Sequence, residues 1–295
     1  MMSFVEVKDS GFNLPTDEGR ENLGQRDFEI AMDLNRTVLL NPLSVFRYSL
    51  DGEPASHNAV RLPQPLIERV VVDFFKIETE IKGLWCPETV KPIEIPEKPD
   101  HNYYKMFALQ FTRAYFFKNL LKCLICNEIL RYHIGEIEEF TDLGAGSGPF
   151  SAALAQSFGP SKLKLLDSSE TQLEIAAHVF QQFKPDVSVS FQDMNVYDFD
   201  ARGKNCVASY AMGESMQNGV DIFRTIKNAN TFTLIDSPFV VRGVNDYLNS
   251  YSCHTLSGHI TFTIEGQLSH FIEGGGGHFC FLHKCSNLDG KKPYL

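Results

Sequence analysis

The glycine-rich stretch at residues 141–150, Thr-Asp-Leu-Gly-Ala-Gly-Ser-Gly-Pro-Phe, constrains the fold of this chain more than any other segment. It follows the apolar segment 134–140 and leads directly into a helical pattern over residues 150–158. Glycine permits sharp turns and lets a ligand approach the backbone closely. A helix that starts after such a turn presents unpaired N–H groups. The pattern therefore predicts a strand, a tight turn and a helix of an α/β fold, with a cofactor site at the turn.

The spacing of the glycines limits which cofactor can bind. Gly144, Gly146 and Gly148 alternate after Asp142, whereas the dinucleotide fingerprint is G-x-G-x-x-G, and no P-loop lysine follows. The pattern Asp-x-Gly-x-Gly-x-Gly resembles motif I of the class I S-adenosylmethionine (SAM) dependent methyltransferases. This resemblance implies that Asp142 lies near the amino-acid end of SAM and that the glycines with Ala145 border its methionine and ribose parts. The alternative is a plain strand-to-helix connection.

Two further acids follow predicted strands. Asp167 ends an apolar run at 162–167, about twenty residues past the glycines, where nucleotide-binding units place a carboxylate on the ribose. Asp193 follows a third strand at 187–191. Either aspartate could simply form a turn. The resemblance implies a ribose contact for Asp167, a contact with the adenine amine for Asp193 and packing of Met194 on the adenine. The full set of candidate cofactor-binding residues is Asp142, Gly144, Ala145, Gly146, Gly148, Asp167, Ser168, Asp193, Met194 and Ser209.

The remaining pattern predicts the rest of an α/β sheet. Further strands are expected at 205–210 and 231–236, with helices at 221–228 and 239–251, and residues 255–285 alternate like an antiparallel hairpin. The resemblance implies a Rossmann-like, doubly wound, mostly parallel sheet of seven strands that ends in this C-terminal hairpin. The four glycines at 274–277 are expected to interrupt the hairpin, because a glycine run is too flexible for a strand interior.

The chain is predicted to divide near residue 100. Residues 1–100 are expected to form a mainly helical extension or cap, with a helix from Pro65 to about Lys82, and residues 101–295 the methyltransferase domain. Four prolines within 86–100 indicate an extended connector. A long amphipathic helical stretch follows at 101–133, and its start could cover the cofactor.

Three residues are candidates for catalysis. Glu214 follows the fourth strand, whose end faces the transferred methyl group in the family, and could be a general base or a helix cap. Tyr104 lies at the start of the helical stretch that could form a lid, and His254 is one of five histidines near the C-terminus. No metal site is predicted, because Cys123 and Cys126 lie in an apolar helical run without a second close pair of zinc-knuckle spacing.

Composition narrows the partners. The net charge of −10 makes nucleic acid an unlikely substrate, and no run of eighteen apolar residues indicates a membrane span. Seven scattered cysteines and a start without signal-peptide character favour the cytoplasm. The sequence thus predicts a SAM-dependent methyltransferase that acts on a small molecule or peptide by in-line displacement. The alternatives are an RNA or protein methyltransferase of the ribosome-associated type, or a SAM-binding protein that does not methylate.

Overall fold

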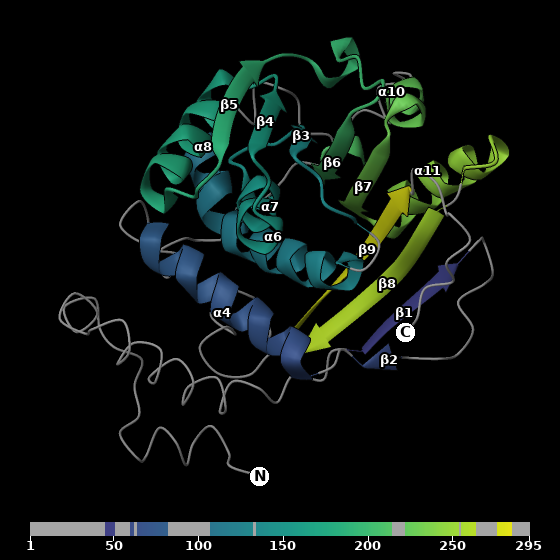
Figure 1. The fold of residues 1–295 in the computed structure, drawn as a ribbon, viewed down its shortest axis with the longest axis horizontal. Helices are drawn as coiled ribbons and strands as arrows, with labels where there is room; N and C mark the ends of the chain where they lie inside the picture. Colours follow the sequence, from purple (N-terminus) through teal and green to yellow (C-terminus); the bar gives the residue numbers. More distant parts are fainter. Residues whose placement is uncertain are drawn as a thin grey trace.

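The computed structural model describes residues 45–50, 60–61, 64–81, 107–131, 134–213, 222–253, 255–263 and 276–284 of the 295-residue chain. These residues form a nine-stranded sheet with helices packed on both of its faces (Figure 1). Two clusters of buried apolar side chains lie between the sheet and the helices that cover it.

Seven of the strands form the predicted sheet, in the order β5-β4-β3-β6-β7-β9-β8. The first five along the chain are parallel, and β9 runs antiparallel to both β7 and β8. This confirms the doubly wound, mostly parallel sheet with a C-terminal antiparallel hairpin. Their bounds are β3 (Glu139–Leu143), β4 (Lys162–Asp167), β5 (Ser188–Asp193), β6 (Asn205–Ser209), β7 (Thr231–Asp236), β8 (Thr255–Thr263) and β9 (Gly276–Lys284).

The first hundred residues contribute two strands that the sequence reasoning missed. Strand β1 (Val45–Leu50) pairs antiparallel with β8 over six residues, and the short β2 (Val60–Arg61) pairs with β1. The outer edge of β8 would otherwise expose unpaired backbone groups, and β1 covers them. Two strands from the region expected to be mainly helical therefore extend the same sheet, and the division near residue 100 stays a prediction.

Five of the six described helices correspond to predicted ones, and α8 (Glu170–Phe183) was not predicted. The other five are α4 (Gln64–Ile81), α6 (Ala108–Leu130), α7 (Pro149–Phe158), α10 (Ile222–Asn228) and α11 (Pro238–Ser250), and there is a short 3-10 turn η3 (Val196–Asp198). Helix α6 differs from the expected amphipathic helix, because nearly all of its residues from Phe116 onward are buried between α4, α7 and the sheet. Cys123 and Cys126 are buried there as free thiols, as predicted. Within the described residues, no helix is both long enough and apolar enough to cross a membrane.

The second half of the glycine run at 274–277 does not interrupt the hairpin as expected. Gly276 and Gly277 are the first residues of β9, and Gly277 pairs with Phe262 of β8. A Cβ at Gly277 would stand 2.6 Å from the Phe262 ring, so glycine is needed for this ring to lie over the strand. Gly274 and Gly275 lie outside the described residues.

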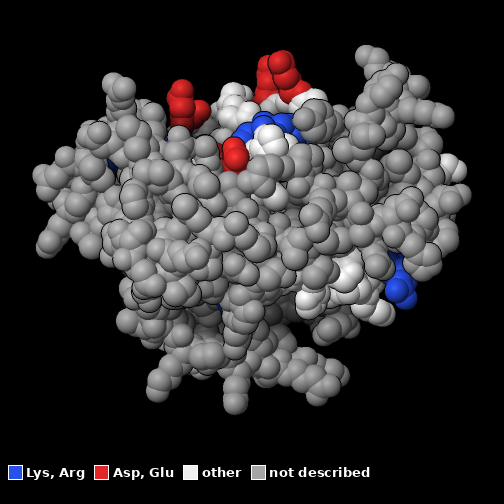
Figure 2. Space-filling view, turned by 90° about the horizontal axis from the view of Figure 1, so that it is seen from below, with Lys and Arg blue, Asp and Glu red and all other residues white. Residues whose placement is uncertain are grey.

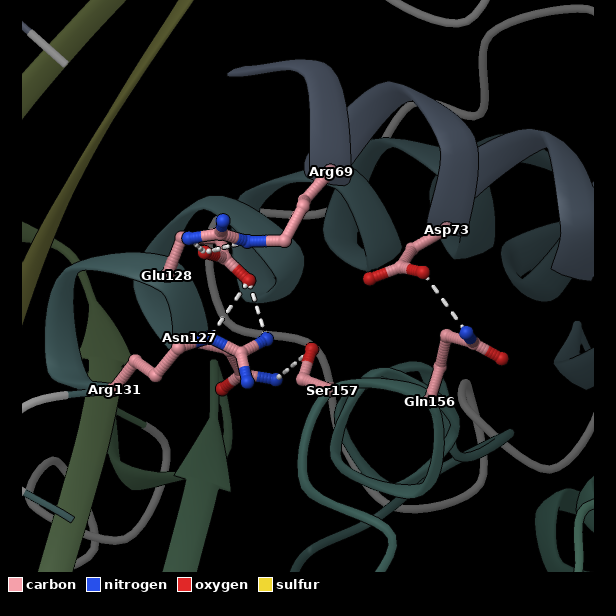
Figure 3. A network of polar contacts seen from close by, with 7 residues as sticks. All are labelled: Arg69, Asp73, Asn127, Glu128, Arg131, Gln156 and Ser157. Atoms are coloured by element: carbon pink, nitrogen blue, oxygen red, sulfur yellow. Dashed lines mark hydrogen bonds and ion pairs between the residues drawn. The ribbon is translucent and has the colours of Figure 1, made fainter. Parts of the chain in front are cut away.

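A buried polar network fastens α4 to the domain (Figure 3). The carboxylate of Glu128 on α6 is 1% exposed and accepts hydrogen bonds from Arg69 of α4, at 2.9 Å, and from Arg131, at 3.1 Å. Gln156 of α7 donates to Asp73 of α4 at 2.8 Å. Since each of these groups is at least partly buried, α4 is held to α6 and α7 by specific polar contacts as well as by apolar packing.

Candidate cofactor site

The candidate site lies where the strand order reverses. From β3 the chain goes to β4 and β5 on one side and then crosses back to β6 on the other, and such switch points bind ligands at the carboxyl ends of the strands (Figure 1). The glycine turn follows β3 at this edge, and residues 210–213 follow β6. The two segments touch, because a Cβ at Gly144 would lie 2.4 Å from the Cβ of Ala211.

The three glycines of the turn all have positive φ angles, of 67° at Gly144, 54° at Gly146 and 83° at Gly148. Their surroundings differ. Gly148 caps the N-terminus of α7, and a Cβ there would come within 3.1 Å of Leu165. At Gly146 the nearest atom to an added Cβ is the Oε1 of Gln172, 3.9 Å away. Packing within the protein thus accounts for the absence of a side chain at Gly144 and Gly148, whereas at Gly146 space remains in front of the backbone.

Asp142 provides a buried carboxyl group directly below the turn. Its Oδ2 accepts a hydrogen bond from the Ser151 hydroxyl at 2.7 Å, and its Oδ1 is buried without a hydrogen-bond partner among the described residues. Burial, with a smaller contribution from the negative charge of Asp167, raises the pKa of this carboxyl to about 7. A positively charged ligand group beside Oδ1 would offset that cost of ionisation.

Asp167 joins the end of β4 to the glycine turn. Its carboxylate accepts hydrogen bonds from the backbone N–H of Gly146 and from that of Ser169, each at 2.8 Å. Ser168, between them in the chain, is exposed. A carboxylate oxygen can accept more than one hydrogen bond, so the same carboxylate that orders the turn could also accept from a ligand hydroxyl. The ribose contact itself stays a prediction.

The remaining candidate cofactor residues lie along the same edge. Asp193 ends β5 in register with Asp167 and is exposed, and the Met194 N–H donates to the Asp167 carbonyl at 3.0 Å. Ser209 ends β6, where its hydroxyl lies 4.0 Å from the Cys123 thiol. All ten candidate residues therefore stand at the carboxyl ends of four adjacent strands, β5, β4, β3 and β6.

The three candidate catalytic residues, Glu214, Tyr104 and His254, lie outside the described residues, so their roles stay predictions. Two groups that the sequence analysis did not single out occupy the same edge. Asp236 at the end of β7 accepts from the Ser237 N–H at 2.7 Å. Burial raises its pKa to about 6 against the lowering effect of backbone N–H groups, including those of Met212 and Gly213. A fourth acid at a strand end was visible in the sequence and could have been included.

Tyr210 is the second missed group, and no sequence signal would have revealed it. It directly follows β6 with a φ of 56°, a left-handed conformation that is rare for a tyrosine, and its side chain is 39% exposed. Its phenol oxygen accepts a hydrogen bond from the ammonium group of Lys122 on α6 at 2.9 Å. The pair joins residues that are 88 positions apart in the sequence.

Residues 140–230 match the family model described as "Methyltransferase domain". This segment is therefore similar to methyltransferase domains, in agreement with the resemblance of the glycine turn to motif I. It contains the glycine turn, strands β4, β5 and β6 and all ten candidate cofactor-binding residues. Methyltransferases of this family use SAM, as the sequence predicted. No relative was found among the curated proteins compared.

Several solved methyltransferase structures resemble the methyltransferase domain. Magnesium protoporphyrin IX methyltransferase from Synechocystis PCC 6803, with bound SAM, is 12% identical over 63% of this chain and 94% of its own, with a TM-score of 0.46. Geranyl diphosphate C-methyltransferase from Streptomyces coelicolor A3(2) is 13% identical over 67% and 90%, with a TM-score of 0.39. An rRNA methylase from Streptococcus thermophilus is 12% identical over 55% and 95%, with a TM-score of 0.37. Likeness at this level does not identify an acceptor.

The residues of the methyltransferase domain fit the chemical groups of SAM. The cofactor carries a sulfonium, an ammonium group and a ribose diol, and the site offers two carboxylates and a turn with open space before its central glycine. Asp142 Oδ1 is a buried acceptor without a partner among the described residues, and Asp167 already accepts from the turn. Among the described residues no group of three or more potential ligands could hold a metal ion.

Proposed function

We propose that this protein transfers a methyl group from SAM to a small-molecule or peptide acceptor by in-line displacement. The observation that carries the proposal is the open position at Gly146, at the switch point of the sheet where Asp142 and Asp167 also lie. The N–H of Gly146 is bound to Asp167, and an added Cβ would meet nothing closer than 3.9 Å. A site of this kind suits a ligand with positive charge and hydroxyl groups.

Each cofactor residue has a role in this proposal. Asp142 faces the amino-acid end, Asp167 holds the ribose hydroxyls, Asp193 accepts from the adenine amine and Met194 packs on the adenine ring. Ala145, Ser168 and Ser209 complete the walls. Bound SAM supplies a methyl group already activated by the sulfonium. The protein's own contribution is to align the acceptor with that methyl and to exclude water, which can supply a large part of the rate enhancement.

The acceptor side of the proposal rests on charge. The chain carries a net charge of −10, which repels a phosphate backbone. On the face drawn in Figure 2, acidic side chains stand beside basic ones, and the described residues there show no continuous basic surface. We therefore favour a small molecule or peptide over RNA. The five described cysteines, all free thiols, agree with the proposed cytoplasmic location.

Glu214, Tyr104 and His254 stay in the proposal as residues on the acceptor side. A base is required only if the accepting atom must lose a proton as the methyl is transferred. Replacing each of the three in turn, by Gln, Phe and Gln respectively, separates these cases. Loss of transfer with unchanged SAM affinity would assign a residue to the acceptor side.

Titration calorimetry tests the cofactor part of the proposal. SAM is titrated into the wild type, into Asp167→Ala and into the control Asp200→Ala, whose carboxylate is exposed and pairs only with Arg202 among the described residues. We expect weakening by at least about tenfold for Asp167→Ala alone, the equivalent of one lost charged hydrogen bond. Equal affinity of all three proteins would reject the ribose contact.

Label transfer tests the acceptor. The full chain is incubated with SAM labelled in its methyl group and with cell extract, which is then separated into small-molecule, protein and RNA fractions. Label in the small-molecule or peptide fraction supports the proposal. Label in the protein or RNA fraction would replace the acceptor class, and SAM binding without label in any fraction would favour a SAM-binding protein that does not methylate.

A further inference from the structure

Lys122 is a half-buried cation on α6, and among the described residues no carboxylate forms an ion pair with it. Arg69 and Arg131 pair with Glu128, and Arg202 pairs with Asp200. The one hydrogen bond that the Lys122 ammonium makes among the described residues is to the phenol oxygen of Tyr210. An ammonium group has three donors, so two of them are left for another partner.

Burial makes this arrangement costly. The pKa of Lys122 is lowered, first because burial disfavours its charge and further because Lys118 lies on the same helix. A partly buried cation without a counter-charge attracts an anion, because the anion restores the electrostatic stabilisation that water would otherwise give. The phenol of Tyr210 does not supply that anion, since burial raises its pKa well above the ordinary value and keeps it neutral.

The backbone of Tyr210 fixes the place of this cation. A left-handed residue other than glycine costs about 1–2 kcal/mol, and such conformations persist where the surrounding contacts enforce them. The Tyr210 N–H donates to the Ile235 carbonyl at 2.9 Å, which holds the residue beside β7. The next residue, Ala211, is in contact with Gly144 of the cofactor turn. The Lys122–Tyr210 pair thus stands next to the cofactor turn, and the partial exposure of Tyr210 leaves it accessible to solvent.

We propose that the ammonium group of Lys122, positioned by the phenol of Tyr210, binds an anionic group of the methyl acceptor. This inference rests on the proposed function and adds to it the chemical class of the acceptor, which carries a carboxylate or a phosphate apart from the atom that is methylated. Tyr210 acts as a positioning residue, because its hydroxyl directs the ammonium toward the edge of the sheet at the end of β6.

Anion binding to the full chain tests the inference without requiring the acceptor. Sodium benzoate and inorganic phosphate are titrated separately into protein saturated with S-adenosylhomocysteine, at constant ionic strength. We expect saturable binding of at least one anion to the wild type, weakening by at least about tenfold in Lys122→Met, and partial retention in Lys122→Arg, which keeps the charge. The control Lys118→Met removes a charge one helical turn earlier and is expected to bind like the wild type.

The outcomes separate this inference from the proposed function. Absence of saturable anion binding to the wild type, or equal binding in wild type and Lys122→Met, overturns the inference. A loss of S-adenosylhomocysteine affinity in Lys122→Met, with unchanged affinity for 5′-methylthioadenosine, also overturns it, because the lysine then holds the carboxylate of the cofactor. Failure of the wild type to bind SAM at all would refute the proposed function itself.

Discussion

Gly146 gives the sharpest test of the cofactor site, because the chain contains a matched glycine elsewhere. Gly146 and Gly159, the residue that ends α7, both have a φ of 54°. An added Cβ at Gly159 would meet nothing within 4 Å, and one at Gly146 would meet only Gln172 at 3.9 Å. Alanine therefore costs each position about the same left-handed strain, about 1–2 kcal/mol of unfolding free energy. The two variants are expected to have equal stability in denaturant titrations.

Binding should separate them. In Gly146→Ala the new methyl group fills the space in front of the turn, where the cofactor must approach the backbone, so SAM affinity is expected to fall by at least about tenfold, or about 1.4 kcal/mol. Gly159→Ala is expected to bind SAM like the wild type. Titration calorimetry of both proteins provides the measurement. If Gly146→Ala bound SAM as tightly as Gly159→Ala, the cofactor would not lie against this turn.

Three further predictions concern stability and pH. Gly144 and Gly203 have nearly equal φ angles, 67° and 69°, but only a Cβ at Gly144 would clash, at 2.4 Å from Ala211. Gly144→Ala should therefore lower the unfolding free energy by about 1–3 kcal/mol more than Gly203→Ala. Equal losses for the two variants would contradict the contact with Ala211. Burial raises the pKa of Asp73 to about 6, so ionisation of this carboxyl lowers the unfolding free energy as pH rises through 6. Asp73→Asn should therefore stabilise the protein by about 2 kcal/mol at pH 8 but not at pH 4. An equal effect in denaturant titrations at both pH values would contradict this. Because the pKa of Asp142 is about 7, SAM affinity should rise about tenfold from pH 6 to pH 8, and calorimetry should show no such rise for Asp142→Asn.

The sequence predicted the glycine turn and the strand ends beside it because their signals are local. Positive φ angles restrict Gly144, Gly146 and Gly148, and alternation of apolar residues marks the strands, so the turn and the ends of β4 and β5 were placed to within a residue or two. Asp167 and Asp193 were expected to share an edge, and they occupy the same register position on adjacent strands. Parallel pairing made this prediction possible, since it brings carboxyl ends together.

The Lys122–Tyr210 pair was not predictable, because its contact is long-range. The hydrogen bond between Lys122 and Tyr210 spans 88 positions, and a lysine in a helical pattern gives no sign of its partner. Strand β1 was missed for a related reason: its partner β8 lies more than two hundred residues away, and six residues of alternating character are too few to outweigh the helical patterns around them. Gly277 was misjudged because only the Phe262 ring explains a glycine within β9.

The contacts around residues 210–213 explain how such a site could align two reactants. This segment is fixed from three directions: the Tyr210 N–H is bound to the Ile235 carbonyl, Ala211 packs against the cofactor turn, and the N–H groups of Met212 and Gly213 face the buried carboxyl of Asp236. In-line methyl transfer depends mainly on the relative placement of nucleophile, methyl and sulfur. Because the segment after β6 is anchored both to β7 and to the glycine turn, an acceptor held there keeps a constant position relative to the cofactor. Its rigidity at this edge would therefore serve catalysis even where no side chain exchanges a proton.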